Sequence, residues 1–503
     1  MVNPEIEKGY LYLDMEQLGS SFSEDKNAQP NLLMNLGEAT FLEKPSVETV
    51  DVVLKQLIRT IRAASPNEAA GLAGDQGLTE KDLVVITVGY VLKNAERYEW
   101  PLVRYQSSYY VYTGTHWQEF NDDRLRAFLG DAAERINVPT FTASYFGFRE
   151  KLFKQFYSAA YFMPPDAKND EVKINLQNGT YVISKEKRYL KGHDQNDFQL
   201  YKLPFDFEPG ATCPRFQKFL DRVLPDKCKQ TVLAEYMGYV FVKNSVLKLE
   251  KGLILYGSGK NGKSVFFEII NALIGPKNMS NYSLQSLTDS NGYTRSLLAG
   301  KLLNYATEIS EKMNTTVFKA LISGEPVEAR MIYKAPFLLT DYCRFIFNTN
   351  NLPKDVEHNL GYARRYIIVP FDQTITEEEK DVSLANKIIA EELPGVFNWV
   401  LQGLENLLDQ GDFTPCPAID FALDEFKRNS DSVALYIEDG NFEPSKDDTI
   451  ALKDLFRWYK EFCKDSNYNC CSIRSFSDRL KNIGFTTTRK SSGRSVGIRK
   501  KKF

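Results

Sequence analysis

The feature that most constrains this chain is the glycine-rich segment GSGKNGKS, which occupies residues 257–264. It follows the apolar run GLILY and precedes VFFEIINALI, whose apolar residues recur at helical spacing. A strand, a glycine loop and a helix in this order are typical of a phosphate-binding element, because the loop's N–H groups and the helix N-terminus face the phosphates. The pattern predicts an α/β nucleotide-binding core built on a parallel sheet.

Every residue of this loop is a candidate nucleotide ligand. Lys263 is expected to reach the β and γ phosphates of ATP, and Ser264 to ligate Mg²⁺. The other candidates are Gly257, Ser258, Gly259, Lys260, Asn261 and Gly262.

Hydrolysis also needs groups that orient water, and two later segments offer them. Residues 302–307 read as a buried strand ending at Glu308, whose carboxylate would help to hold Mg²⁺ and act as the base. Taken alone, a glutamate such as Glu308 is more often a surface acid, but its order and spacing after the glycine loop favour the catalytic reading. Asn350 ends the apolar strand in RFIFNTNNLP and could bind the γ-phosphate or water; an asparagine-rich turn is the alternative.

Basic residues near two other elements are further candidates. Arg364 and Arg365 precede the apolar run YIIVPF, and an arginine there can complete a neighbouring subunit's site. The segment FKALISGEPVEARMIYKAPF predicts a helix, a turn at residues 323–325 and two β-forming runs around basic residues.

The chain of 503 residues predicts several domains, so the fold class is α/β and multidomain. A helix is expected within residues 46–64, a flexible linker over 65–78, and β-hairpins in YYVYTGTHWQEF and at Asn178-Gly179. Two helices followed by a basic hairpin near the end predict a winged helix. The expected divisions are an accessory region over 1–78, a mixed α/β domain over 79–205, a helical collar over 206–248, the ATPase core over 249–375, a helical segment over 376–434 and the winged helix over 435–503.

Composition and charge limit the compartment and the kind of nucleic-acid contact that we expect. The net charge of −3 gives no overall attraction to nucleic acid, so DNA contacts are expected from local patches, above all Arg489, Lys490 and Arg494. The seven cysteines form no CxxC pair, which fits a reducing compartment and argues against structural zinc. No apolar run reaches membrane-spanning length and the first residues lack a signal-peptide pattern, so we expect a cytoplasmic protein.

The glycine loop, the strand before Glu308, SGEPVEAR, FNTNNLP and RRYIIVPF, in this order, resemble superfamily 3 helicases. The closest likeness is to the C-terminal halves of phage, plasmid and poxvirus-type primase-helicases, over residues 105–503. The resemblance implies an AAA+ related motor, a hexameric ring with ATP between subunits, and 3′ to 5′ movement on single-stranded DNA. It also implies a bacterial host cell.

Carried over by residue, the likeness makes Lys263 and Ser264 the P-loop pair, Glu308 the Walker B acid, Asn350 the sensor, and Arg364 or Arg365 the finger. It also implies a channel hairpin within residues 319–334, where Lys334, then Arg330, and Lys319 are the candidate DNA contacts. Thr307 departs from the commonest pattern, in which a second acid precedes the Walker B glutamate.

The leading hypothesis is therefore a replicative DNA helicase of a phage or mobile element that uses ATP and Mg²⁺ and works with a separate primase or polymerase. An origin-melting initiator and a nucleotide-gated DNA-binding scaffold are the alternatives. Asp14 and Glu16 could share one face of a strand, as metal ligands of a primase would, but no suitable histidine follows them within the residues before the familiar region.

Overall fold

The computed structural model describes residues 49–62, 65–73, 76–164, 170–306, 313–352, 363–466, 468–490 and 493–501. Its contacts divide the chain into two compact units. The amino-terminal unit comprises Met1–Lys168, Gly179–Tyr181 and Leu190–Lys202. The carboxyl-terminal unit comprises Asn169–Asn178, Val182–Tyr189 and Leu203–Phe503. Among the described residues, no helix is long and apolar enough to cross a membrane.

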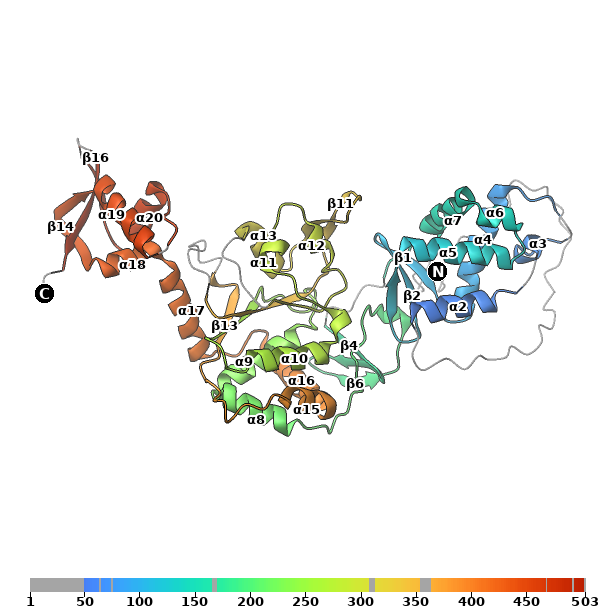
Figure 1. Cartoon of the computed structure of the whole chain (residues 1–503), viewed down its shortest axis with the longest axis horizontal. Coiled ribbons are helices and arrows are strands. Elements are labelled where there is room, and N and C mark those ends of the chain that lie inside the picture. Colours follow the sequence, from blue (N-terminus) through green and yellow to red (C-terminus); the bar gives the residue numbers. More distant parts are fainter. Residues whose placement is uncertain are drawn as a thin grey trace, which may run out of the picture. The chain divides into compact units, whose positions relative to one another are not determined.

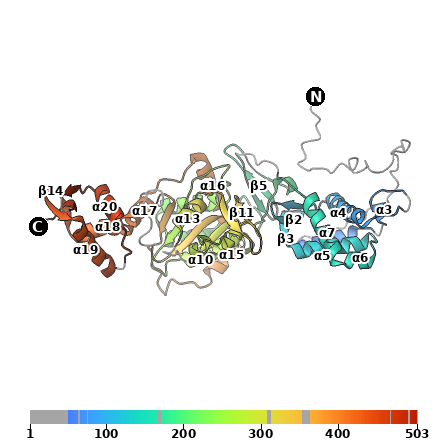
Figure 2. The same ribbon diagram turned by 90° about the horizontal axis from the view of Figure 1, so that it is seen from above.

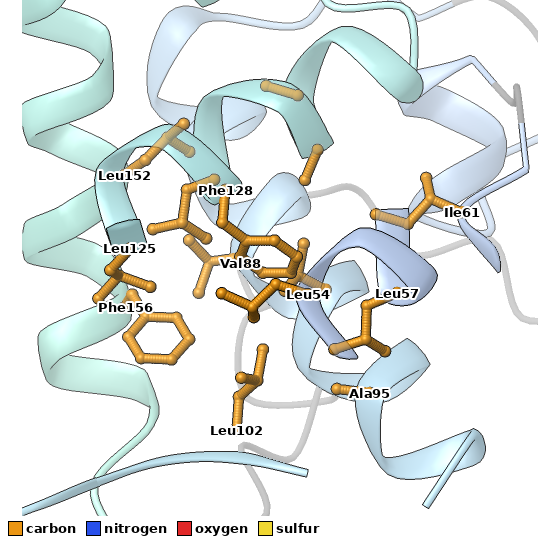
Figure 3. Packing of buried hydrophobic residues seen from close by; sticks show 14 of the residues in the cluster. Leu54, Leu57, Ile61, Val88, Ala95, Leu102, Leu125, Phe128, Leu152 and Phe156 are labelled. Atoms are coloured by element: carbon orange, nitrogen blue, oxygen red, sulfur yellow. The ribbon is translucent and has the colours of Figure 1, made fainter. Parts of the chain in front are cut away.

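Helices surround the main core of the amino-terminal unit. Leu54, Val88, Leu125 and Phe156 come from four different helices and converge in that core (Figure 3). The fourth of them, Phe156, is completely buried. The helices are α2 (Val50–Thr60), α3 (Pro66–Ala69), α4 (Glu80–Arg97), α5 (Asp122–Arg135), α6 (Thr140–Ser144) and α7 (Phe146–Ala159).

The shared core corrects the expected domain boundary at residues 65–78. Helix α2 was expected and is present, but its apolar face packs into the same core as α4, α5 and α7. Residues 65–78 are also not wholly linker, because Ser65 caps the short helix α3 and the buried Asn67 donates to the Gln76 carbonyl at 3.2 Å. This segment therefore joins two helices of one domain.

Two small sheets follow in the chain. Strands β1 (Leu102–Tyr105), β2 (Ser108–Tyr112) and β3 (Trp117–Phe120) form an antiparallel meander, which confirms the hairpin expected in YYVYTGTHWQEF. Strands β4 (Val172–Leu176), β5 (Gly179–Ile183) and β6 (Arg188–Lys191) form the second sheet, with the expected Asn178-Gly179 turn between β4 and β5. The Asn178 side chain forms two hydrogen bonds with the backbone of Phe207. Residues 169–178, which include β4, therefore belong to the carboxyl-terminal unit. The expected single domain over 79–205 is thus divided.

A parallel sheet of five strands, in the order β13-β7-β12-β9-β8, forms the centre of the carboxyl-terminal unit. This confirms the predicted α/β class with a parallel sheet. Its strands are β7 (Gly252–Tyr256), β8 (Met279–Ser280), β9 (Leu303–Ala306), β12 (Arg344–Thr349) and β13 (Tyr366–Pro370). They are almost continuously buried, as expected for strands covered on both faces.

Helices cover both faces of this sheet (Figure 1). One face packs on α11 (Leu284–Leu287) and α13 (Thr315–Ile322), while α12 (Tyr293–Ser296) contacts the antiparallel hairpin β10 (Val327–Arg330) and β11 (Pro336–Leu339). Figure 2 views the strands from the α13 side. The other face is covered by α9 (Lys227–Tyr239) and α10 (Lys263–Ile274), beside α8 (Pro214–Val223), α15 (Leu384–Glu391) and α16 (Leu393–Gln410).

The expected collar and the later helical segment pack together. Helix α9 lies directly on α16, and a side chain at Gly403 would stand 2.2 Å from the Ala234 carbonyl carbon. Helix α17 (Pro417–Ser430) packs Phe426 against Tyr366 of β13. The helices before and after the core therefore cover the same sheet, so residues 206–248 are not a separate body.

The last part of the chain has its own core. Its order is α18 (Ser432–Asp439), β14 (Phe442–Ala451), α19 (Leu452–Asp465), α20 (Ile473–Asn482), β15 (Thr487–Lys490) and β16 (Gly493–Lys500). The two expected helices and the hairpin are present. Helix α18 begins before the expected boundary at 435, and β14, which the sequence did not indicate, pairs with β16.

Candidate functional site

The glycine loop lies between β7 and α10, as the sequence predicted. Gly259 and Gly262 adopt positive φ angles of 110° and 87°, which favour glycine. A Cβ at Gly262 would also stand 2.7 Å from Val223 of α8. The backbone conformation of the loop at residue 262 therefore favours glycine.

Lys263 points its ammonium group back into this loop. The nitrogen donates to the Gly257 carbonyl at 2.7 Å, to Asn261 Oδ1 at 3.0 Å and to Asn350 Oδ1 at 3.4 Å. The residue is 6% exposed, and burial lowers the pKa of its ammonium. All three acceptors are neutral oxygens, and no described carboxylate forms an ion pair with Lys263. A buried cation without a negative partner is costly, so the arrangement suits an anionic ligand.

Asn350 reaches Lys263 because of the strand order. It follows β12, which pairs in parallel with β7 on one side and β9 on the other, so all three strands end at the same edge. Ser264 is exposed in the first turn of α10, at that edge. Glu308 lies outside the described residues; β9 ends two residues earlier, at Ala306.

A segment after β13, residues 371–380, lies along the glycine loop and was not anticipated from the sequence. Asn261 donates to the Phe371 carbonyl at 3.1 Å, and the Ile375 N–H donates to the Lys260 carbonyl at 2.7 Å. Lys260 itself is exposed and pairs with Glu377 at 2.7 Å. The acidic run TEEEK was visible in the sequence, but nothing placed it beside the loop.

The same segment is fixed to α8. Arg222 donates two hydrogen bonds to Glu379, at 2.9 and 2.7 Å, and a third to the Thr374 carbonyl at 2.8 Å. The two bonds from Arg222, together with one from the Thr376 N–H, lower the pKa of the Glu379 carboxyl to about 2. The segment and α8 thus hold the glycine loop from two sides.

The two candidate finger arginines differ in environment. Arg365 is 9% exposed; its Nε donates to the Ser323 hydroxyl at 3.0 Å, and its guanidinium lies 3.8 Å from Glu250. The Arg364 side chain is 65% exposed, with one ion pair to Glu250 at 3.4 Å. Arg365 is therefore engaged within its own chain, and Arg364 is the more exposed of the two.

The β10–β11 hairpin presents its tip to solvent. Tyr333 is completely exposed at a φ of 61°, and Ile332 beside it is 66% exposed. Lys334 is exposed at the same tip, while Arg330 donates to the Lys334 carbonyl at 3.3 Å and lies over the Tyr293 ring. Lys319, by contrast, is half-buried in α13, outside the hairpin. Sequence reasoning missed Tyr333, although an aromatic between two basic residues was a usable signal.

The carboxyl-terminal hairpin places two arginines opposite each other. Arg489 of β15 pairs in register with Arg494 of β16, and both are exposed. Lys490 pairs with Gly493 in the ladder, and its side chain lies outside the described part of the chain. Like charges directly across a strand pair repel, so this pair would be stabilised by an anion.

Comparisons with known proteins match three stretches of the chain. Residues 95–225 match the "D5 N terminal like" family, 419–500 the "Poxvirus D5 protein-like" family, and 255–365 a family of unknown function, DUF5906. A "Putative helicase L207/L206" of Acanthamoeba polyphaga mimivirus is 25% identical over 208 residues, which is 40% of this chain and 21% of the viral protein. Over the first two of these stretches, the chain is therefore similar to D5-type proteins.

Solved structures similar to this chain include two of the C-terminal region of NrS-1. The A form of the apo structure has a TM-score of 0.46 at 11% identity and covers 80% of this chain and 97% of its own. A second apo structure has a TM-score of 0.43, also at 11% identity, with coverage of 81% and 97%. These scores are too low to establish a shared fold. The chain spans only about a fifth of the viral relative that it matches.

Proposed function

We propose that this chain is an ATP-dependent DNA helicase of a phage or mobile element, acting in DNA replication. The observation that carries the proposal is the buried Lys263 ammonium, held among neutral oxygens at the carboxyl edge of a parallel sheet, 3.4 Å from Asn350. A triphosphate would provide the negative charge that this site lacks. The similarity to D5-type families and to a viral protein named as a putative helicase supports the same reading.

The chain's residues would divide the work at this site. The loop from Gly257 to Gly262 would turn its N–H groups toward the phosphates, and Lys263 would neutralise the β and γ phosphates. Ser264 would supply a hydroxyl ligand to Mg²⁺, which when bound withdraws charge from the phosphates. Glu308 would orient the attacking water, and the Asn350 amide would hold the γ-phosphate or that water.

Arg364 would complete the site of a neighbouring subunit. Its side chain is exposed and pairs with Glu250 among the described residues, whereas Arg365 is buried and bonded to Ser323. A finger supplied from a neighbour requires an oligomer, and we propose the hexameric ring of the family. Such a finger contributes about 10³–10⁵ in kcat.

The β10–β11 hairpin would hold single-stranded DNA in the ring channel. Lys334 offers an exposed cation for phosphate, and Tyr333 offers an open ring on which a base can stack. Arg330 is a weaker candidate because its Nε already donates within the hairpin. Lys319 would act from α13 only if the strand passed beside that helix.

The last part of the chain would bind duplex DNA as a winged helix. Its order of helix, strand, two helices and a hairpin fits that class, and Arg489 and Arg494 lie on the wing. Lys490 would add a third cation there. An origin-melting initiator would rely on this part more than on the hairpin, and it remains the second candidate function. A nucleotide-gated scaffold is the third.

Strand separation on a duplex with a 3′ single-stranded tail tests the proposal. Wild type should unwind it with ATP and Mg²⁺, Lys263→Ala should not bind ATP, and Glu308→Gln should bind ATP without unwinding. A duplex with a 5′ tail should remain intact if movement is 3′ to 5′. ATP hydrolysis without strand separation on either substrate, with any separate primase or polymerase partner present, would favour the initiator or the scaffold.

A further inference from the structure

The amino-terminal unit carries a second cluster of exposed aromatic and basic side chains, separate from every residue used above. Arg104 lies in the half-buried second half of β1, and its guanidinium carbon lies 4.1 Å from the ring centroid of Tyr157 and 4.9 Å from that of Tyr161. The cation therefore lies between two phenol rings.

Backbone contacts fix Arg104 in this position. Its N–H donates to the Ala160 carbonyl at 2.6 Å, and its own carbonyl accepts from the Phe162 N–H at 2.9 Å, which places β1 beside the residues that follow α7. Its Nε donates to the Tyr157 carbonyl and its Nη1 to the Gln106 carbonyl, both at 2.8 Å. The guanidinium is thus oriented before any ligand arrives.

The charge of Arg104 is not neutralised. Its side-chain partners are carbonyl oxygens, and within the described ranges no carboxylate forms an ion pair with it. Lys154 stands three residues before Tyr157 on α7 and so shares its face; it is exposed, and no described acid pairs with it. Tyr157 thus links two cations, Arg104 by direct contact and Lys154 by helical spacing, and neither pairs with a described carboxylate.

The two rings are also open to solvent. Tyr157 is 45% exposed and Tyr161 46% exposed, so each ring keeps a large accessible area. If Arg104 served only to pack α7 against β1, the rings would be expected to bury more of that area. Exposed planar rings beside a fixed guanidinium are the groups on which unpaired bases stack, while the cations attract the phosphates.

We propose that Arg104, Lys154, Tyr157 and Tyr161 form a binding surface for single-stranded nucleic acid. A single strand offers both a negative backbone and open base faces. A duplex hides its base faces, and an acidic peptide offers charge without planar rings. This surface goes beyond the proposed function, which requires DNA only at the β10–β11 hairpin and the carboxyl-terminal hairpin, and it does not depend on ATP hydrolysis.

Photo-crosslinking of the full chain tests the surface directly. The probe is a single-stranded oligodeoxythymidine that carries iododeoxyuridine. It is used in the absence of ATP, and the crosslinked peptides are mapped by mass spectrometry. Crosslinks are expected on the peptides that contain Tyr157 and Tyr161. Crosslinks confined to other parts of the chain would overturn the proposal.

Affinity gives a second, independent readout. In a chain that already carries Tyr333→Ala and Lys334→Ala, the pair Tyr157→Leu and Tyr161→Leu should weaken oligonucleotide binding about fivefold to hundredfold, since one stacked base contributes that much. The corresponding Phe pair should bind as tightly as the parent, because it keeps the rings. Tyr189→Leu is the matched control, at 44% exposure.

The outcomes separate this surface from the proposed function. All variants keep the backbone carbonyl of residue 157, which accepts a hydrogen bond from Arg104. Thermal melting compares the stability of the Leu pair with that of the Phe pair. Equal affinity in both pairs, or binding of oligoglutamate in place of the oligonucleotide, would overturn the proposal. A loss seen only in the Leu pair supports it even if the wild type fails to unwind DNA. Single-stranded RNA in parallel shows whether the strand must be DNA.

Discussion

The Lys263 ammonium lies 3.4 Å from Asn350 Oδ1, although 87 residues separate the two in the chain. Parallel strands β7 and β12 bring them together, since the glycine loop follows one strand and Asn350 follows the other. A neutral amide near this lysine leaves the positive charge available to a phosphate. An acid in its place would compete for it.

Asn350→Ala should therefore separate nucleotide binding from hydrolysis. Lys263 keeps its bonds to Gly257 and Asn261, so ATP affinity should change by only a few fold. The turnover number should fall by about 10²–10³, the usual loss when one preorganised donor to the reacting group is removed. Steady-state ATPase rates and titration with a fluorescent nucleotide measure the two effects. A large loss of affinity with normal turnover would exclude the sensor role.

The buried position of Lys263 predicts a pH dependence of ATP binding. Burial lowers the pKa of its ammonium, so the neutral form becomes populated at a lower pH than for an exposed lysine. Only the charged form attracts phosphate, and ATP affinity should fall as pH rises toward that lowered pKa. Bound phosphate raises the pKa again, so binding at alkaline pH should take up protons.

Calorimetry in two buffers of different ionisation enthalpy would detect this uptake. Lys263→Arg is the control, because a guanidinium stays charged throughout the range. Proton uptake of the same size in both proteins would assign the effect to another group.

How much of this site the sequence could predict depends on the range of each interaction. The glycine loop and the strand before Asn350 are local patterns, and parallel pairing then requires their ends to meet at one edge. The bond from Arg222 to Glu379 joins residues 157 apart in sequence, and no local pattern indicates it. No local pattern indicates the bond from Arg365 to Ser323 either. That bond distinguishes Arg365 from Arg364, although the two arginines are adjacent in the sequence and chemically identical.

Domain boundaries were less predictable than elements for a related reason. Helix α2 was expected from its own apolar spacing, which is local information. Whether its apolar face packs on α4 or forms a separate domain is decided by long-range contacts, and glycines in residues 65–78 do not reveal that. The exposed Tyr333 was missed because β-forming residues in a short run usually indicate burial.

Arg364→Ala and Arg365→Ala should fail in different ways. Arg364 is exposed, so its loss should leave thermal stability unchanged and reduce hydrolysis by about 10³–10⁵, with dominant inhibition when mixed with wild type. Arg365 holds Ser323, so Arg365→Ala should destabilise the fold by about 1–3 kcal/mol. Thermal melting and ATPase assays of mixed oligomers distinguish them. Normal hydrolysis in Arg364→Ala would remove it as the finger.

Gly262 and Gly259 offer a matched pair for the glycine loop. Both have positive φ angles, but a Cβ at Gly259 would meet open space, while at Gly262 it would meet Val223 and Phe219. Gly262→Ala should therefore destabilise the protein by about 1–3 kcal/mol more than Gly259→Ala, the usual cost of overpacking. Denaturant unfolding followed by tryptophan fluorescence measures the difference. Equal stability of the two variants would show that α8 yields to the extra methyl group.

The two facing arginines of the carboxyl-terminal hairpin predict a salt-dependent contact with duplex DNA. Arg489 and Arg494 are in register, and mutual repulsion is relieved when both meet phosphates. Each neutralised phosphate contributes about 0.9 to the slope of log K against log salt concentration, so Arg489→Gln with Arg494→Gln should flatten that slope by about 2. The double variant should also be slightly more stable without DNA, because the repulsion is gone.

Arg499 serves as the control: it already pairs with Glu443 at 2.7 Å, so Arg499→Gln should leave the slope nearly unchanged. A slope that responds to Arg499 and not to the facing pair would place the duplex on the other edge of this small sheet.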